Sequence, residues 1–200
     1  MANLEPLIQS IPVAPLKLAS LEGCRTLADQ VNNYLVSFRH ESPTNVGQDD
    51  SLQGYCADSY LLECECPRFG SGEGKGVLKE SVRGCDLFIM VDVTNYSLTY
   101  RVNGYENHMS PDNHYQDLKR IISAADGKAR RINVIMPFLY EGRQHKRSKR
   151  ESLDCALMLQ ELVDMGVSNI LTFDAHDPRV SNSIPLHGFD SFMPTYQFLK

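Results

Sequence analysis

The sequence lacks several features that would each assign the protein to a particular class. No apolar run approaches the roughly 20 residues that a membrane-spanning helix needs, so we expect no membrane partner. Basic residues do not predominate, because 20 Lys and Arg stand against 25 Asp and Glu, and we therefore expect no nucleic-acid partner bound by bulk positive charge. The N-terminus carries Glu5 and has no basic segment ahead of an apolar stretch, which disfavours a secretory signal and favours a cytoplasmic protein.

The six cysteines are predicted to be free thiols. Most of them lie inside apolar segments, and without an export signal the compartment is expected to be reducing. Cys64 and Cys66 alternate along a strand-like run, but no second ligand pair follows at zinc-finger spacing. A zinc site at these two residues is therefore disfavoured.

The second half of the chain alternates between apolar strands and amphipathic helices, which predicts an α/β fold with a mostly parallel sheet flanked by helices. Ser110 and Pro111 are typical of a helix start, and Gly127 of a helix end. Apolar residues at helical spacing predict the inner faces of two helices: Tyr115, Leu118, Ile122 and Ala125 in the first, and Leu157, Leu159, Leu162 and Val163 in the second. The strands are expected at 86–93, 132–139 and 169–174, and the second helix at 153–165.

The first half is less regular. Residues 1–22 predict an extended arm or one short strand, and a helix is expected over 24–38, with Leu27, Val31, Leu35 and Phe38 at helical spacing. Residues 60–80 are expected to form a small projecting antiparallel flap around the glycine-rich segment 69–76. That segment is not a phosphate-binding Walker loop, because no hydroxyl residue follows its Gly-Lys pair, and a hairpin turn is the simpler interpretation. Residues 94–109 form a polar excursion rich in Tyr and Asn.

Two polar groups of residues follow strands of the predicted sheet, at the edge where open α/β sheets bind ligands. Five Lys or Arg lie between Arg143 and Arg150, and such a loop suits phosphate oxygens, although a solvated charged loop would have the same composition. Asp174 and His176 follow the strand 169–174 and could hold a hard cation, although a capping Asp and a surface His are the simpler alternative. A cation site beside an anion site indicates a magnesium nucleotide and phosphoryl chemistry.

Four segments, in order, resemble the ribose-phosphate pyrophosphokinase (phosphoribosyl pyrophosphate synthetase) family. Residues 69–73 (FGSGE) are similar to its Phe-x-Asp/Asn-Gly-Glu segment, and residues 80–89 (ESVRGCDLFI) to its Glu-Ser-Val-Arg-Gly-x-Asp-Val-Phe-Ile stretch. Arg143 and Gln144 match the Arg-Gln of its Tyr-Ala-Arg-Gln-Asp loop, and residues 174–176 match its Asp-Leu-His. The resemblance covers about residues 69–195, and more loosely the chain from residue 20.

The resemblance implies a type I phosphoribosyltransferase-like fold, used twice per subunit. It implies Mg²⁺-dependent transfer of the diphosphoryl group of ATP to the C1 hydroxyl of ribose 5-phosphate, in a homo-oligomer. Phe69 and Glu73 would then reach the adenine site of a neighbouring subunit. Arg143 and Gln144 would bind ATP, and His176, with Asp174 beside it, would serve the metal.

The sequence also departs from the family pattern. Ser71 replaces an acidic or amide residue, His145 an acidic one, Ala156 a common Lys and Ser152 a common Pro, and the 94–109 connection is longer than usual. The family's C-terminal phosphoribosyltransferase-like half, with its sugar-phosphate loop, is absent, so we expect residues 1–200 to be an N-terminal domain that is incomplete for catalysis. A catalytically inactive regulatory or assembly homologue, or a binding domain without nucleotide specificity, remains an alternative.

Overall fold

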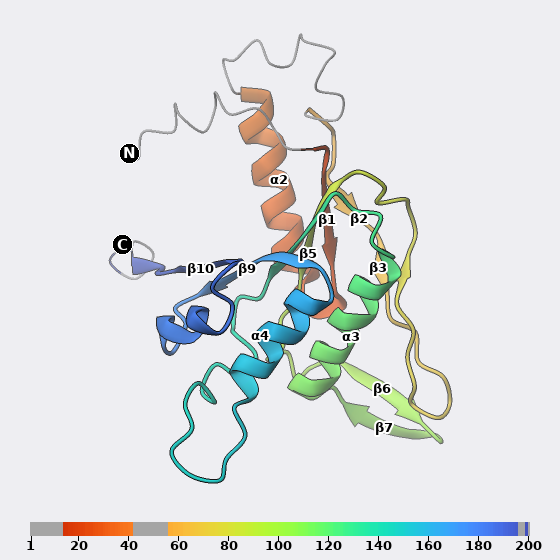
Figure 1. Cartoon of the computed structure of the whole chain (residues 1–200). Coiled ribbons are helices and arrows are strands. Elements are labelled where there is room, and N and C mark those ends of the chain that lie inside the picture. Colours follow the sequence, from red (N-terminus) through yellow and green to blue (C-terminus); the bar gives the residue numbers. More distant parts are fainter. Residues whose placement is uncertain (1–13, 42–55, 196–198, 200) are drawn as a thin grey trace.

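A six-stranded sheet forms the centre of the molecule in the computed structural model, which describes residues 14–41, 56–195 and 199 (Figure 1). The strand order is β10-β9-β8-β5-β1-β2, and every neighbouring pair is parallel. The strands are β1 (Leu16–Ser20), β2 (Leu61–Leu62), β5 (Asp86–Met90), β8 (Arg131–Ile135), β9 (Val167–Phe173) and β10 (Gly188–Phe192). The predicted α/β class is confirmed, and the three strands expected in the second half are adjacent as β5, β8 and β9.

Helices cover both faces of the sheet. The helices α3 (Pro111–Ala124) and α4 (Asp154–Asp164) pack on one face, while α2 (Arg25–Glu41) packs on the other. Two short 3-10 helices, η1 (Glu22–Cys24) and η4 (Pro178–Ser183), precede α2 and β10 respectively. The predicted start of α3 is confirmed, because the Ser110 hydroxyl accepts a hydrogen bond from the Asn113 N–H and Pro111 occupies the first turn. Within the described residues no helix is long and apolar enough to cross a membrane.

The predicted inner face of α3 is confirmed, but two leucines of the other helices point outward. Leu157 of α4 is 58% exposed, because the buried positions 155, 158, 159 and 162 follow the helical period and residue 157 lies off it. Leu27 of α2 is also exposed, and the buried residues of that helix are Ala28 and Asn32. The Asn32 side-chain oxygen accepts the Tyr60 N–H at 2.8 Å, so α2 packs against the sheet through Ala28, this satisfied polar residue and the half-buried Val31, which the helical spacing had predicted.

Of the two alternatives expected for residues 1–22, one short strand is confirmed, and an extended arm is wrong for residues 16–20. Residues 16–20 form β1, which lies inside the sheet between β2 and β5, and residues 1–13 lie outside the described part of the chain. Leu18 points toward α2, and Ala19 toward the helices of the opposite face. A run this short, preceded by Pro15, does not show enough alternation to identify a central strand.

The predicted flap over residues 60–80 is only partly confirmed. Its first strand, β2, pairs in parallel with β1 and belongs to the main sheet, while β3 (Cys64–Glu65) and β4 (Val77–Leu78) form the expected antiparallel pair. The flap does not project freely, because Leu78 packs against the core below α3. Gly76 permits this approach, since a Cβ there would lie 2.3 Å from the Arg120 carbonyl oxygen. Only the segment around residues 69–73 projects.

The polar excursion over residues 94–109 contains a two-stranded hairpin of β6 (Thr99–Val102) and β7 (Tyr105–His108). Asn103 and Gly104 connect the strands, and both have positive φ, of 49° and 84°. This is the backbone that a two-residue hairpin turn needs, and Asn-Gly is its strongest sequence signal.

The six cysteines are free thiols, as predicted.

Candidate functional site

The structure brings the two predicted polar groups together at the carboxyl edge of the sheet. The basic loop, residues 143–150, follows β8, and Asp174 and His176 follow the neighbouring strand β9. The His145 and His176 rings lie with centroids 5.0 Å apart, and His145 Nε2 is 3.5 Å from an Asp177 oxygen. The sequence predicted both groups at one edge of the sheet, but no sequence pattern indicated that His145 of the first group would lie against the second.

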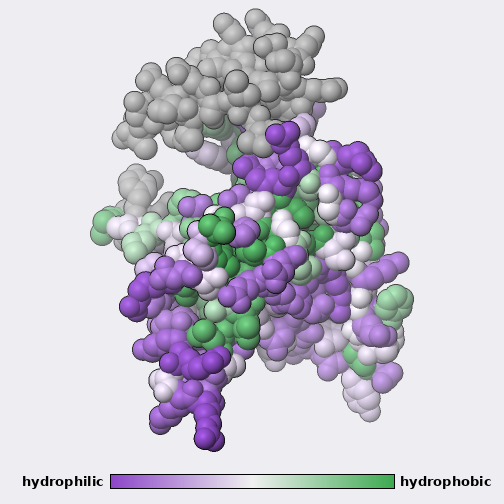
Figure 2. All heavy atoms as spheres, in the orientation of Figure 1, coloured by the Kyte–Doolittle hydropathy of each residue, from purple (hydrophilic) through white to green (hydrophobic). Residues whose placement is uncertain are grey.

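The basic loop carries five exposed cations: Arg143, Lys146, Arg147, Lys149 and Arg150. None of the five forms an ion pair with another described residue. In Figure 2 the corresponding projection, at the lower left, is almost entirely hydrophilic. This loop therefore presents unneutralised positive charge on a chain whose net charge is −5.

Backbone hydrogen bonds fix the root of the basic loop. The Gly142 N–H donates to the Leu139 carbonyl, and the Gln144 N–H donates to the Glu141 carbonyl at 2.8 Å. The Gln144 carbonyl in turn accepts the Cys155 N–H at the start of α4. Arg143 and Gln144 thus leave an anchored turn, while residues 146–150, beyond His145, extend into solvent (Figure 1).

Asp174 and His176 are the two exposed groups at the end of β9 that remain available to a ligand. The Asp174 N–H donates to the Phe192 carbonyl at 2.9 Å, which holds its backbone at a φ of 44° beside β10. Neither side chain has a hydrogen-bond or ion-pair partner among the described residues. Asp177 is already engaged: the Arg179 side chain and N–H both donate to its carboxylate and hold the pKa of that carboxyl well below its ordinary value.

These donors fit a magnesium ion only in part. No three His, Cys, Asp or Glu side chains of the described residues converge as a ready-made metal site. Mg²⁺ prefers oxygen ligands, keeps several waters, and is commonly held by one or two carboxylates together with substrate phosphates. Asp174 and His176 could therefore contribute to a site that waters and phosphates complete, but they could not form one alone.

The second predicted binding segment, the turn over residues 69–73, lies away from the basic loop on the other side of the molecule (Figure 1). Its ends are closed by two backbone bonds, from the Phe69 N–H to the Glu73 carbonyl and from the Gly72 N–H to the Phe69 carbonyl. The Phe69 side chain is 54% exposed, and the Ser71 hydroxyl donates to the Glu73 carboxylate at 2.8 Å. The chain therefore does not bring Phe69 and Glu73 to its own Arg143 and Gln144.

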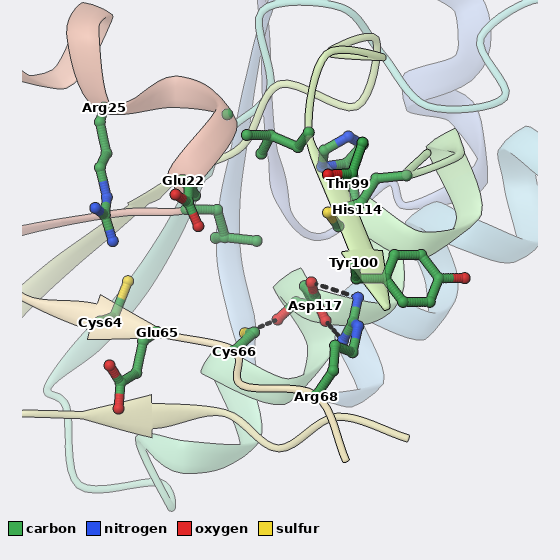
Figure 3. Close-up of a pocket in the computed structure, with 14 residues that line it drawn as sticks. Glu22, Arg25, Cys64, Glu65, Cys66, Arg68, Thr99, Tyr100, His114 and Asp117 are labelled. Carbon is green, nitrogen blue, oxygen red and sulfur yellow. Dashed lines mark hydrogen bonds and ion pairs between the residues drawn. The ribbon is translucent and has the colours of Figure 1, made fainter. Parts of the chain in front are cut away.

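Sequence reasoning missed a pocket of about 120 Å³ at the carboxyl end of β1 (Figure 3). The connection after β1 covers one face of the sheet and the connection after β5 covers the other, so the pocket lies near the switch point where α/β sheets bind ligands. Arg25 lines one side, near Cys64, and forms no ion pair within the described residues. On the other side Asp117 is bound by Arg68 and by Arg120.

Comparisons with known proteins find relatives of this chain both by sequence and by fold. A family model described as the N-terminal domain of ribose phosphate pyrophosphokinase matches residues 16–166. The chain belongs to this family. It is 29% identical over 167 residues to the ribose-phosphate pyrophosphokinases of Corynebacterium ammoniagenes and Bacillus cereus, in matches that cover 82% of this chain and 41% of each relative.

A solved structure in the same family has the same fold. Phosphoribosylpyrophosphate synthetase from Mycobacterium smegmatis superposes with a TM-score of 0.69 at 22% identity, over 92% of this chain and 50% of that one. The chain thus spans half or less of the length of these pyrophosphokinase relatives. The matched half contains both the basic loop and the 69–73 turn.

Proposed function

We propose that this chain is the ATP-binding half of a ribose-phosphate diphosphokinase. The reaction transfers the diphosphoryl group of ATP to the C1 hydroxyl of ribose 5-phosphate and gives phosphoribosyl pyrophosphate and AMP, for nucleotide biosynthesis. One observation carries the proposal: in a member of this family, five cations without an ion-pair partner among the described residues lie at the carboxyl edge of the sheet, beside Asp174 and His176. Unneutralised positive charge beside metal-binding groups is what a magnesium nucleotide requires.

Each group of the basic loop then has a physical role. The Arg143 guanidinium offers a planar set of donors to phosphate oxygens, and the Gln144 amide donates or accepts beside it. Asp174 and His176 would hold Mg²⁺, which when bound neutralises charge developing on the transferred phosphate oxygens. Because positioning and electrostatics supply most of the catalysis in phosphoryl transfer, the chain's own contribution is to hold the triphosphate in place.

The adenine contacts are proposed to come from a second copy of the chain. The 69–73 turn is distant from the basic loop of its own chain, yet it exposes an aromatic ring and a carboxylate. Phe69 would stack on the base, and Glu73 would accept a hydrogen bond from its exocyclic amine. A homo-oligomer in which the turn of one copy meets the basic loop of another satisfies both observations.

A pair of substitutions in the basic loop tests the proposal. Arg143→Ala should weaken ATP binding in the complete protein by roughly 2–5 kcal/mol, because it removes a charge-assisted contact at a site that ATP desolvates. Lys149→Ala, further out on the same loop, should cost less than about 1 kcal/mol. Titration calorimetry measures the affinity of both variants for ATP. Equal losses of binding free energy would show that the loop acts only as a diffuse patch of charge.

A catalytically inactive regulatory or assembly homologue is the second candidate. It is favoured by His145, which replaces the family's acidic residue and faces Asp177 instead of solvent, and by Ser71 and Ala156. AMP release that depends on ribose 5-phosphate, measured on the complete protein, separates the two candidates. Residues 1–200 alone should release no AMP, because the sugar-phosphate half of the positioning is missing.

A further inference from the structure

The β6–β7 hairpin contacts the 69–73 turn directly. The Asn103 N–H, at the tip of the hairpin, donates to the Gly70 carbonyl at 3.3 Å. A Val102 methyl lies against Gly72, only 3.0 Å from where a Cβ of that residue would be. Gly72 has a φ of 92°, so the turn uses the one residue that allows both this backbone and this approach.

A second contact connects the hairpin and the flap to the body of the molecule. The Arg68 guanidinium, one residue before the turn, lies 5.3 Å from the centre of the Tyr100 ring in β6. The same guanidinium donates to both carboxylate oxygens of Asp117 in α3. Figure 3 shows these three side chains together at one wall of the pocket. The start of the turn is therefore held between the hairpin and a helix of the core.

The base of the hairpin is itself anchored. The Tyr96 and His108 rings stack with centroids 4.5 Å apart, and His108 Nδ1 is 2.9 Å from the Tyr96 carbonyl oxygen. The buried His114 of α3 lies with Nε2 2.6 Å from the Asn95 carbonyl oxygen, and the Asn95 side chain donates to the Gly23 carbonyl. Because the base of the hairpin is fixed to α3 and to the segment before α2, the core of the molecule determines where the tip of the hairpin lies.

We infer that the β6–β7 hairpin is a positioning element for the 69–73 turn, and that Val102 is the residue through which it acts. The hairpin lies within the 94–109 connection and braces the turn from the side. Its consequence for catalysis rests on the proposed function: with the turn held, Phe69 and Glu73 keep one orientation toward the nucleotide of a second copy. A turn attached only through β3 and β4, which are two residues each, would lack this lateral support.

The register of the hairpin supplies a matched control. Side chains alternate along β6, so Tyr100 and Val102 lie on the face that meets the flap, while Arg101 lies on the opposite face, across from Glu106. Arg101→Ala and Val102→Ala therefore truncate neighbouring residues of one strand, but only the second removes a contact with the turn.

Hydrogen exchange of the full chain tests the inference without nucleotide. Val102→Ala should speed exchange of the Phe69 and Gly72 amides at least 5-fold, because both donate the bonds that close the turn. Val102→Thr, which keeps the branched shape, should restore protection, and Arg101→Ala should leave it within 2-fold. The Met109 N–H, which donates to the Leu98 carbonyl at the hairpin base, should stay protected throughout and report an intact hairpin. Unchanged turn exchange in Val102→Ala, or an equal rise in Arg101→Ala, overturns the inference.

A second readout separates this inference from the proposed function. In the complete protein Val102→Ala should raise the KM for ATP several-fold with little change in kcat, because the adenine contacts are displaced while the phosphate contacts remain. Faster turn exchange without a change in KM would support the brace and would overturn the proposed role of the turn at the adenine. Unchanged exchange overturns the brace whatever the KM.

Discussion

The Arg68 guanidinium donates to both carboxylate oxygens of Asp117, at 2.6 and 2.8 Å, and their side chains are only 10% and 6% exposed. Arg120 donates to the same carboxylate. A shielded ion pair of this kind contributes little to the stability of the fold compared with an apolar pair, but removing one partner leaves a buried charge uncompensated. This ion pair therefore holds the flap against α3, because breaking it would leave a buried charge without a partner.

Asp117→Ala should therefore lower the free energy of unfolding by about 3–5 kcal/mol, because two guanidinium groups lose their shared partner. Urea denaturation followed by circular dichroism measures the change. Glu65→Ala is the matched control, because its ion pair with Lys79 is exposed and should be worth less than about 1 kcal/mol. Similar losses in the two variants would mean that the Asp117 site is hydrated in solution.

His176→Ala should weaken binding of Mg-ATP to the complete protein on the order of 10-fold and leave metal-free ATP nearly unaffected. The reason is that a lone imidazole is a poor Mg²⁺ site, so its effect appears only when phosphates complete the coordination. Calorimetry with ATP, with and without Mg²⁺, gives the two affinities. His187→Ala, at an exposed position beyond η4, should change neither. An equal loss in the two titrations would make His176 a surface residue with no part in the metal site.

The stability of the chain should fall between about pH 9 and pH 11 through its buried thiols. Burial raises the pKa of Cys64 from its ordinary value of 9.0 to about 11. Above pH 9 the unfolded chain loses this proton while the folded chain keeps it, so the free energy of unfolding decreases by up to about 1.4 kcal/mol per pH unit for this thiol. Below pH 9 both states hold the proton and the contribution does not change with pH.

Cys64→Ala isolates this effect. The difference in unfolding free energy between wild type and variant should be constant below pH 9 and should shrink as the pH rises toward 11. Cys56→Ala, at an exposed thiol, should give a curve parallel to wild type throughout. A difference that does not vary with pH in Cys64→Ala would show that the folded thiol ionises as readily as the unfolded one.

The sequence predicted the parts of the fold in which one signal was strong. The strands β5, β8 and β9 lie in segments rich in apolar residues, and most of their residues are buried or half-buried, while α3 has a capping residue, an N-terminal Pro and a terminal Gly. The sequence indicated one short strand within residues 1–22 and strand structure around β2, but it could not give the places of β1 and β2 in the sheet, because five and two residues show too little alternation and their partners are distant in the chain. The β6–β7 hairpin was predictable from Asn103-Gly104, and the prediction missed it because the surrounding residues are polar.

At the site, chain order was enough to place Arg143, Gln144, Asp174 and His176 on one edge, since neighbouring parallel strands end together. It was not enough to place His145 against Asp177, which depends on how the basic loop folds back. The pocket near Arg25 was also beyond prediction, because its walls come from η1, β3, the hairpin and α3.

The strand order has a consequence for how the polypeptide folds as it leaves the ribosome. β2 is added on one side of β1, and β5, β8, β9 and β10 are then added on the other side in the order in which they are synthesised. Each of these emerging strands therefore finds its neighbour already made, and none has to insert between two strands that have already paired. Nascent chains of this topology can extend a sheet outward from β1 without waiting for the C-terminus, which shortens the time during which apolar strand edges are open to aggregation.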